Sequence, residues 1–189
     1  MISILIYNNL NDKIIIVMKK ILEYEKTNLK LIEAFKKITS DGKKITVPNL
    51  CKEANIHEQT FYKHFPSKDL FIEYAVKLKL ENFYETNKNL SLHDFFSLVL
   101  ETCYKEKTHP TSRIEDYFVK GIIYIELEKL IKKKLVLASI IDDDSTIDFL
   151  TGGILFYISK AIKEVNTDNA FLYTQQKLDI LITKIIAKS

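Results

Sequence analysis

Apolar residues recur at helical spacing along most of the chain, and short polar or turn-forming stretches separate the periodic runs. Within residues 24–39, four apolar residues repeat every three or four positions and predict a first helix: Leu31, Ile32, Phe35 and Ile38. Gly42 follows and suits the end of that helix. Only 4 Gly and 3 Pro occur in 189 residues, which argues against a turn-rich β architecture. We therefore expect an all-α protein.

A short second helix is predicted after residue 46. Thr46 can cap its N-terminus through the side-chain hydroxyl, and Pro48 falls in the first turn, where no backbone N–H is needed. Asn55 readily adopts the left-handed conformation that ends a helix sharply, so residues 54–56 predict a tight turn. One apolar stripe runs along this helix, formed by Val47, Leu50, Cys51 and Ala54.

A further helix is predicted to begin near His57 and to end at Pro66. Its inward positions are Phe61 and Phe65, and Ser67 then suits the N-cap of the next helix. The residues left facing outward are polar or amphipathic: Glu58, Gln59, Thr60, Tyr62, Lys63 and His64. Two short helices across a tight turn, with a polar outer face on the second, are typical of a DNA-binding helix-turn-helix.

This stretch resembles the DNA-binding domain of the TetR family of bacterial transcriptional regulators. The matching elements, in the family's order, are Thr46, the turn 54–56, the run Thr60-Phe61-Tyr62-Lys63-His64-Phe65 and the pair Ser67-Lys68. Asn55 stands where the family usually has Gly, and Pro48 is less common at its position. The resemblance covers roughly residues 28–75.

The resemblance implies a set of DNA contacts. Thr46, Thr60, Tyr62, His64 and Lys68 would contact phosphates, since hydroxyl groups, lysine and the start of a helix can all donate to phosphate oxygens. Base edges would be contacted by Gln59, with Tyr62 and Lys63 as further candidates. Lys43 and Lys44 precede the second helix and are either phosphate contacts or solvated surface.

The composition of the motif bears on the DNA sequence that it would bind. Gln can form two hydrogen bonds with adenine, whereas the usual guanine-binding residue, Arg, is missing from the motif. Arg113 is the only arginine of the chain, and Lys63 is the one plausible guanine contact in the second helix of the motif. We therefore expect an operator that is rich in A/T. Glu58 would repel phosphates and could cap its own helix instead, and no pH switch is predicted for His57 or His64.

The rest of the chain predicts a larger helical domain. A long helix from Ser67 to about Lys88 precedes a helix over 92–105, opened by Ser91 and Asp94. After a loop at 107–112, residues 117–137 predict one or two helices that end in three lysines, which we interpret as a solvated last turn. Acidic residues 142–144 precede a helix to about Val165, and Thr167 or Asp168 caps the last helix.

In total we expect about nine helices, with a three-helix DNA-binding domain followed by a helical domain for effector binding and dimerisation. The predicted boundaries are an N-terminal extension at 1–22, the DNA-binding domain at 23–70 and the larger domain at 71–189. The first 17 residues are either an extension of the first helix or a leader upstream of a natural start at Met18, and they lack the features of a signal peptide.

The last two helices resemble the family's dimerisation pair, which packs against its copy as a four-helix bundle. The alternative is that both bury their apolar faces within one subunit. Gly152 and Gly153 lie inside the first of these helices, where each Gly costs about 1 kcal/mol relative to Ala, so we expect that a close neighbour requires the space.

By resemblance, the larger domain would hold a small apolar or aromatic effector. Aromatic residues at helical spacing are more often part of a core, but tyrosines provide the few polar groups that such pockets use. The candidate effector-lining residues are Phe96, Tyr104, Tyr117, Phe118, Tyr124, Phe149 and Phe156.

The function expected from this pattern is a cytoplasmic, homodimeric repressor that binds a palindromic double-stranded DNA operator and is released by a small-molecule effector. The alternative is a co-activator or architectural DNA-binding protein of the same type, acting through protein contacts without an effector. No Gly-rich phosphate loop, nucleophile elbow or zinc-protease helix occurs, so we expect neither an enzyme nor a metal or cofactor site. Cys51 and Cys103 are expected to be buried, reduced thiols, and the interrupted apolar leader is too short to span a membrane.

Overall fold

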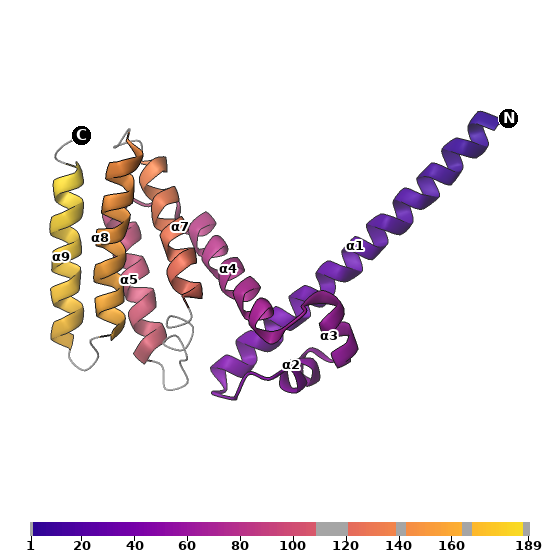
Figure 1. The fold of residues 1–189 in the computed structure, drawn as a ribbon, viewed down its shortest axis with the longest axis horizontal. Helices are drawn as coiled ribbons and strands as arrows, with labels where there is room; N and C mark the ends of the chain where they lie inside the picture. The colour runs from indigo at the N-terminus through magenta and orange to yellow at the C-terminus, as the bar shows by residue number, and fades with distance from the viewer. Residues whose placement is uncertain (1, 109–120, 139–142, 164–167, 187–189) are drawn as a thin grey trace. The chain divides into compact units, whose positions relative to one another are not determined.

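The computed structural model describes residues 2–108, 121–138, 143–163 and 168–186. Eight α-helices and no strands occur in these ranges (Figure 1), which confirms the all-α prediction for the described part of the chain. The chain divides into two compact units, Met1–Phe71 and Ile72–Ser189, and the division falls inside the helix Lys68–Asn87. None of the described helices is long and apolar enough to cross a membrane.

Unit 1 contains α1 (Ile2–Ser40), α2 (Val47–Ala54), α3 (Glu58–His64) and the first turn of α4 (Lys68–Asn87). The first helix continues well upstream of residue 24, where the compact domain was expected to begin. It ends at Ser40, and Gly42 follows with a φ of 68°, in agreement with the predicted role of this glycine at the helix end. An ion pair between Lys37 and Glu53 links α1 to α2.

The core of unit 1 combines aliphatic side chains of α1 and α2 with a group of aromatic rings. Phe61 and Phe71 are fully buried, and their ring centroids lie 5.8 Å apart. Phe65 and Phe35 also pack edge-on against Phe71, at 5.1 Å and 5.8 Å. This aromatic group fixes α3 against both α1 and the start of α4.

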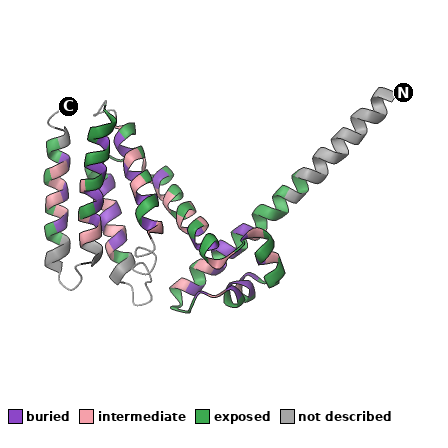
Figure 2. Ribbon diagram, in the orientation of Figure 1, coloured by how far each residue is buried: buried purple, intermediate pink, exposed green. Residues whose placement is uncertain are grey.

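Unit 2 contains the remainder of α4 together with α5 (Leu92–Thr108), α7 (Ile122–Leu137), α8 (Asp144–Lys163) and α9 (Asp168–Ile186). One hydrophobic core joins these helices, and Figure 2 shows buried residues along their facing sides. Phe95, Phe96, Ile131 and Ile154 are its fully buried centre. Ser91 caps α5 as predicted, because its Oγ accepts from the N–H of Asp94, and Asp143 Oδ1 accepts from the N–H of Thr146 at the start of α8. Thr167, one of the two predicted caps of the last helix, lies outside the described residues.

The lysine run at the end of α7 differs from its predicted role as solvated surface. Lys134 is buried, and its ammonium group donates to the carbonyl oxygens of Lys88 at 2.7 Å and Leu90 at 2.6 Å. Burial lowers the pKa of this lysine. The two carbonyl groups lie just beyond the last turn of α4, so Lys134 holds the α4–α5 connection in place. The other two lysines pair with carboxylates, Lys132 with Asp148 and Lys133 with Glu85.

Candidate nucleic-acid interface

The helix-turn-helix of unit 1 is formed by the local signals that predicted it. Thr46 caps α2 by accepting from the N–H of Asn49 at 3.2 Å, and Pro48 lies in the first turn. Asn55 has φ 53° and ψ 52°, the left-handed conformation expected for the turn. All four residues of the predicted apolar stripe are buried: Val47, Leu50, Cys51 and Ala54. Burial raises the pKa of the Cys51 thiol, and Cys51 and Cys103 are both buried thiols outside any disulfide, as predicted.

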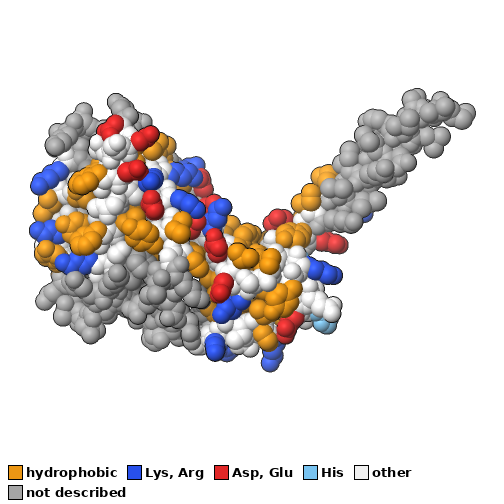
Figure 3. All heavy atoms as spheres, in the orientation of Figure 1, with side chains coloured by type: hydrophobic (Ala, Val, Ile, Leu, Met, Phe, Trp, Pro, Cys, Tyr) orange, Lys and Arg blue, Asp and Glu red, His pale blue; other side chains and the backbone are white. Residues whose placement is uncertain are grey.

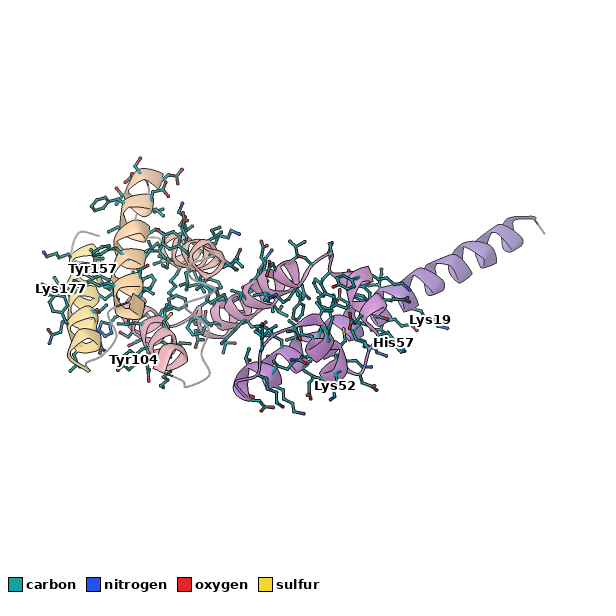
Figure 4. All side chains as sticks on the ribbon, turned by 60° about the horizontal axis from the view of Figure 1, so that its bottom comes forward. Lys19, Lys52, His57, Tyr104, Tyr157 and Lys177 are labelled. Carbon is teal, nitrogen blue, oxygen red and sulfur yellow. The ribbon has the colours of Figure 1, made fainter. Side chains whose placement is uncertain are left out.

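Helix α3 turns one face inward and one outward. Phe61 is fully buried, whereas Gln59, Tyr62 and Lys63 are exposed. The ring of Tyr62 packs edge-on against Phe61, with centroids 5.4 Å apart, so its orientation is set by the core. Glu58 is exposed in the first turn of α3, and the helix has no side-chain cap at its N-cap residue, His57 (Figure 4). The exposed side of α3 therefore presents one carboxylate, one amide, one phenol and one ammonium group.

The remaining predicted DNA contacts flank this face in sequence. Lys43 and Lys44 are exposed after the end of α1, and Lys43 pairs with Asp41 at 2.8 Å, which lowers the pKa of that carboxyl. Thr46 and Thr60 are half-buried. Lys68 is half-buried at the start of α4, where Ser67 Oγ accepts from the N–H of Leu70 at 3.2 Å.

His64 has two partners on α1 that the sequence did not indicate. Its Nδ1 atom lies 2.8 Å from Oδ1 of Asn28, and its ring stacks on that of Tyr24, with centroids 3.9 Å apart. Burial lowers the pKa of His64, and the charge of Glu25 opposes this shift. Asn28 and Tyr24 were missed as site residues. Asn28 gave a signal, because it is a polar residue in the same helical stripe as Leu31, Ile32 and Phe35.

The five described residues among the predicted effector-lining set differ widely in burial. Phe96 is fully buried in the core of unit 2, and Tyr104 is half-buried on α5 (Figure 4). Tyr124, Phe149 and Phe156 are 40%, 79% and 61% exposed, so these three side chains lie at the surface of the subunit. Tyr117 and Phe118 lie outside the described residues.

Among the described residues, no group of three His, Cys, Asp or Glu side chains is placed to hold a metal ion. The hydroxyl, amide and ammonium groups among the predicted contact residues of unit 1 can donate hydrogen bonds. Their chemistry suits the binding of an anionic polymer through its oxygen atoms.

No family model and no curated protein sequence matches this chain. A solved structure that does match is a transcriptional regulator (TerR/AcrR family) from Aquifex aeolicus VF5. The two sequences are 21% identical, the match covers 84% of this chain and 99% of that chain, and the TM-score is 0.49. The resemblance to the TetR family therefore rests on the residues of the helix-turn-helix motif.

Proposed function

We propose that this protein is a homodimeric transcriptional repressor that binds a palindromic DNA operator through α3 and leaves it when a small molecule binds unit 2. The observation that carries the proposal is the outer face of α3, where Gln59, Tyr62 and Lys63 are exposed on a helix fixed from behind by Phe61. A rigid helix with polar side chains on one face fits the major groove.

The neighbouring segments supply groups for phosphate oxygens. Thr46 Oγ1 accepts one hydrogen bond at the N-terminus of α2, so its hydroxyl proton is available to a phosphate. The N-terminus of α4 adds backbone N–H groups and the ammonium group of Lys68. Lys44 is the stronger of the two loop lysines for this purpose, because part of the charge of Lys43 is balanced by Asp41.

The test is binding of the purified protein to a labelled duplex from the DNA upstream of its own coding sequence. Replacing both Tyr62 and Lys68 by Ala is expected to weaken binding at least about 100-fold per dimer, since four contacts to DNA are lost. Lys105→Ala is the matched control, because this exposed lysine belongs to unit 2, where it pairs with Glu101, and is not part of the motif. Equal binding by the double variant and the control would reject the proposal.

Dimerisation through α8 and α9 forms a second part of the proposal. Phe149, Gly152 and Phe156 are all exposed and recur at i, i+3 and i+7, so they form one stripe on α8. A Cβ atom built on Gly152 would meet nothing within 4 Å, so within the described part of the subunit no neighbour requires this glycine. A Cβ atom on Gly153 would lie 3.8 Å from Cδ2 of Leu181, which is ordinary van der Waals contact. The open space beside Gly152 therefore suits a helix of a second copy as the expected close neighbour.

Helix α9 packs against α8 and also exposes large apolar side chains: Leu172, Tyr173 and Ile180 are 52%, 47% and 49% exposed. Hydrophobic side chains are visible among the charged residues on the surface of unit 2 in Figure 3. Large apolar side chains that gather on an exposed surface can mark an interaction site. Two copies of the α8–α9 pair would form a four-helix bundle and would provide the two recognition helices that a palindrome needs.

Of the five described candidate residues for the effector step, Phe96 is buried and Tyr104 is half-buried. We infer that occupancy of unit 2 would act on DNA binding through α4, which runs from Lys68 in unit 1 to Asn87 in unit 2. The aromatic dye 8-anilinonaphthalene-1-sulfonate can test this. An interior site would be supported if the dye keeps its fluorescence with the double variant Phe149→Asp/Phe156→Asp and loses it with Tyr104→Ala. The opposite pattern would favour a regulator that acts through protein contacts.

A further inference from the structure

Three side chains connect the last turn of α3 to α1. Nδ1 of His64 lies 2.8 Å from Oδ1 of Asn28, and the imidazole ring stacks on Tyr24 with 14° between the planes. The Tyr24 hydroxyl also donates to the backbone carbonyl of His64 at 3.3 Å. Asn28 is buried. Both the side chain and the backbone of His64 are therefore held by α1.

This geometry determines which ring nitrogen carries the proton. An amide oxygen only accepts hydrogen bonds, so Nδ1 of His64 donates to Oδ1 of Asn28. In a neutral imidazole the other nitrogen, Nε2, then has no hydrogen and can only accept. A phosphate oxygen also only accepts. A neutral His64 held in this way cannot donate to the DNA backbone, whereas the doubly protonated ring can.

We propose that DNA binding takes up one proton at His64 in each subunit, and that Asn28 and Tyr24 are positioning residues that direct Nε2 toward the DNA. The proposal rests on the DNA-binding function proposed above. Proton uptake at His64 would make operator binding stronger as the pH falls. The sequence analysis predicted no pH switch at this residue.

The surroundings of His64 set the direction of the effect. Burial lowers the pKa of the ring in the free protein, so the neutral form is favoured before binding. Glu25 of α1 is the charged group that acts on the ring, and it favours the cation. Asn28 is uncharged, and Phe65, after α3, contributes a ring at 6.4 Å. A nearby phosphate would raise the pKa of His64, so this pKa is higher in the DNA complex than in the free protein. The affinity for DNA therefore falls as the pH rises from the pKa of the free protein to that of the complex.

The experiment measures operator affinity by fluorescence anisotropy from about pH 5.5 to 8.5 at constant ionic strength, the range in which His titrates. The wild-type affinity is expected to fall with pH, by at most about tenfold per pH unit for each proton taken up. His64→Gln is expected to abolish the slope, because an amide donates without titrating. His57→Gln is the matched variant and is expected to keep it, since exposed His57 makes no side-chain cap to α3.

Two variants test the positioning residues. Asn28→Asp places a carboxylate against Nδ1, so the midpoint of the pH profile is expected to move to higher pH. Tyr24→Phe keeps the ring stack and is expected to leave the midpoint unchanged, whereas Tyr24→Ala removes the stack and is expected to move it. A purely structural role for these residues would change overall affinity without moving the midpoint. Circular dichroism at each pH shows that every variant is folded.

Several results would overturn the proposal. A flat wild-type profile, or a slope retained in His64→Gln, would show that no proton enters at this residue on binding. Nitrogen NMR of the free protein with the proton on Nε2 and a bare Nδ1 would contradict the tautomer. Binding without pH dependence leaves the DNA-binding function intact and rejects proton uptake alone. No operator binding at any pH would reject both.

Discussion

The outer face of α3 in unit 1 and the outer face of α8 in unit 2 are opposite in chemistry. On α3 the exposed residues include Gln59, Tyr62 and Lys63, and the large apolar side chain, Phe61, is buried. On α8 the exposed stripe consists of Phe149, Gly152 and Phe156. Both helices bury one face in the core of their own unit. The difference indicates that one surface is suited to a hydrated, anionic partner and the other to a second apolar helix.

The largest effect is expected from removing the aromatic side chain behind the α3 face. Phe61→Ala should cost about 3–5 kcal/mol of unfolding free energy, because a fully buried ring packed on Phe65 and Phe71 is lost. Phe95→Ala provides the comparison in unit 2, where an equally buried ring contacts Phe96. Urea denaturation followed by circular dichroism measures both. We expect Phe61→Ala to abolish DNA binding while the dimer persists. Loss of DNA binding together with loss of the dimer would contradict the assignment of these two roles to separate units.

Two substitutions that place carboxylates on the exposed stripe of α8 test its role in self-association. Phe149→Asp with Phe156→Asp should weaken self-association by about 2 kcal/mol or more per side chain, which is about 30-fold or more each. Sedimentation equilibrium gives the dimer dissociation constant. Val136→Asp is the control, since Val136 is 57% exposed on α7. A monomeric wild-type protein, or a double variant that remains as dimeric as the control, would contradict the assignment of this face.

A smaller effect is expected at the start of α2. Thr46→Ala removes the hydroxyl that accepts from the N–H of Asn49 and should lower the unfolding free energy by about 1 kcal/mol. The same change removes a proposed phosphate contact, whereas Thr46→Ser keeps both roles. Thermal unfolding and operator affinity should therefore decrease together in the Ala variant and recover in the Ser variant. Unchanged operator affinity in Thr46→Ala would show that Thr46 caps α2 but does not contact the DNA.

The smallest effect distinguishes the two lysines that follow α1. Lys44→Ala should reduce the slope of log affinity against log salt concentration by about one per subunit, as loss of one phosphate contact predicts. Lys43→Ala should change it less, because Lys43 is paired with Asp41. Titrations of the same duplex at several salt concentrations measure both slopes. Equal slopes for Lys43→Ala and Lys44→Ala would contradict the proposal that Lys44 makes the stronger phosphate contact.

The sequence predicted those features that depend on neighbouring residues. Thr46, Asn55 and Ser67 each act within three or four positions along the chain, and each behaves as its residue type predicts. The bond between His64 and Asn28 joins residues 36 positions apart, and no local pattern encodes it. Lys134 was misjudged for the same reason, because the carbonyl groups that it binds come from a different helix end.

Orientation was the second limit of sequence analysis. Helical spacing places Phe149 and Phe156 on one face of α8, but it does not say whether that face meets the core or the surface. Both were assigned to an effector pocket because they are aromatic. Their exposure depends on where α5 and α9 pack against α8, which only the tertiary fold determines.

The salt dependence of operator binding tests the central claim most directly. With about 6 to 10 phosphate contacts per dimer, affinity should fall by roughly 10³ to 10⁵ between about 50 and 200 mM salt. The protein's own upstream DNA serves as the duplex, and Lys105→Ala serves as the control for general loss of charge. We predict this steep fall for the wild type and a shallower one for Lys44→Ala. A flat salt response of the wild-type protein would contradict DNA binding by this face of unit 1.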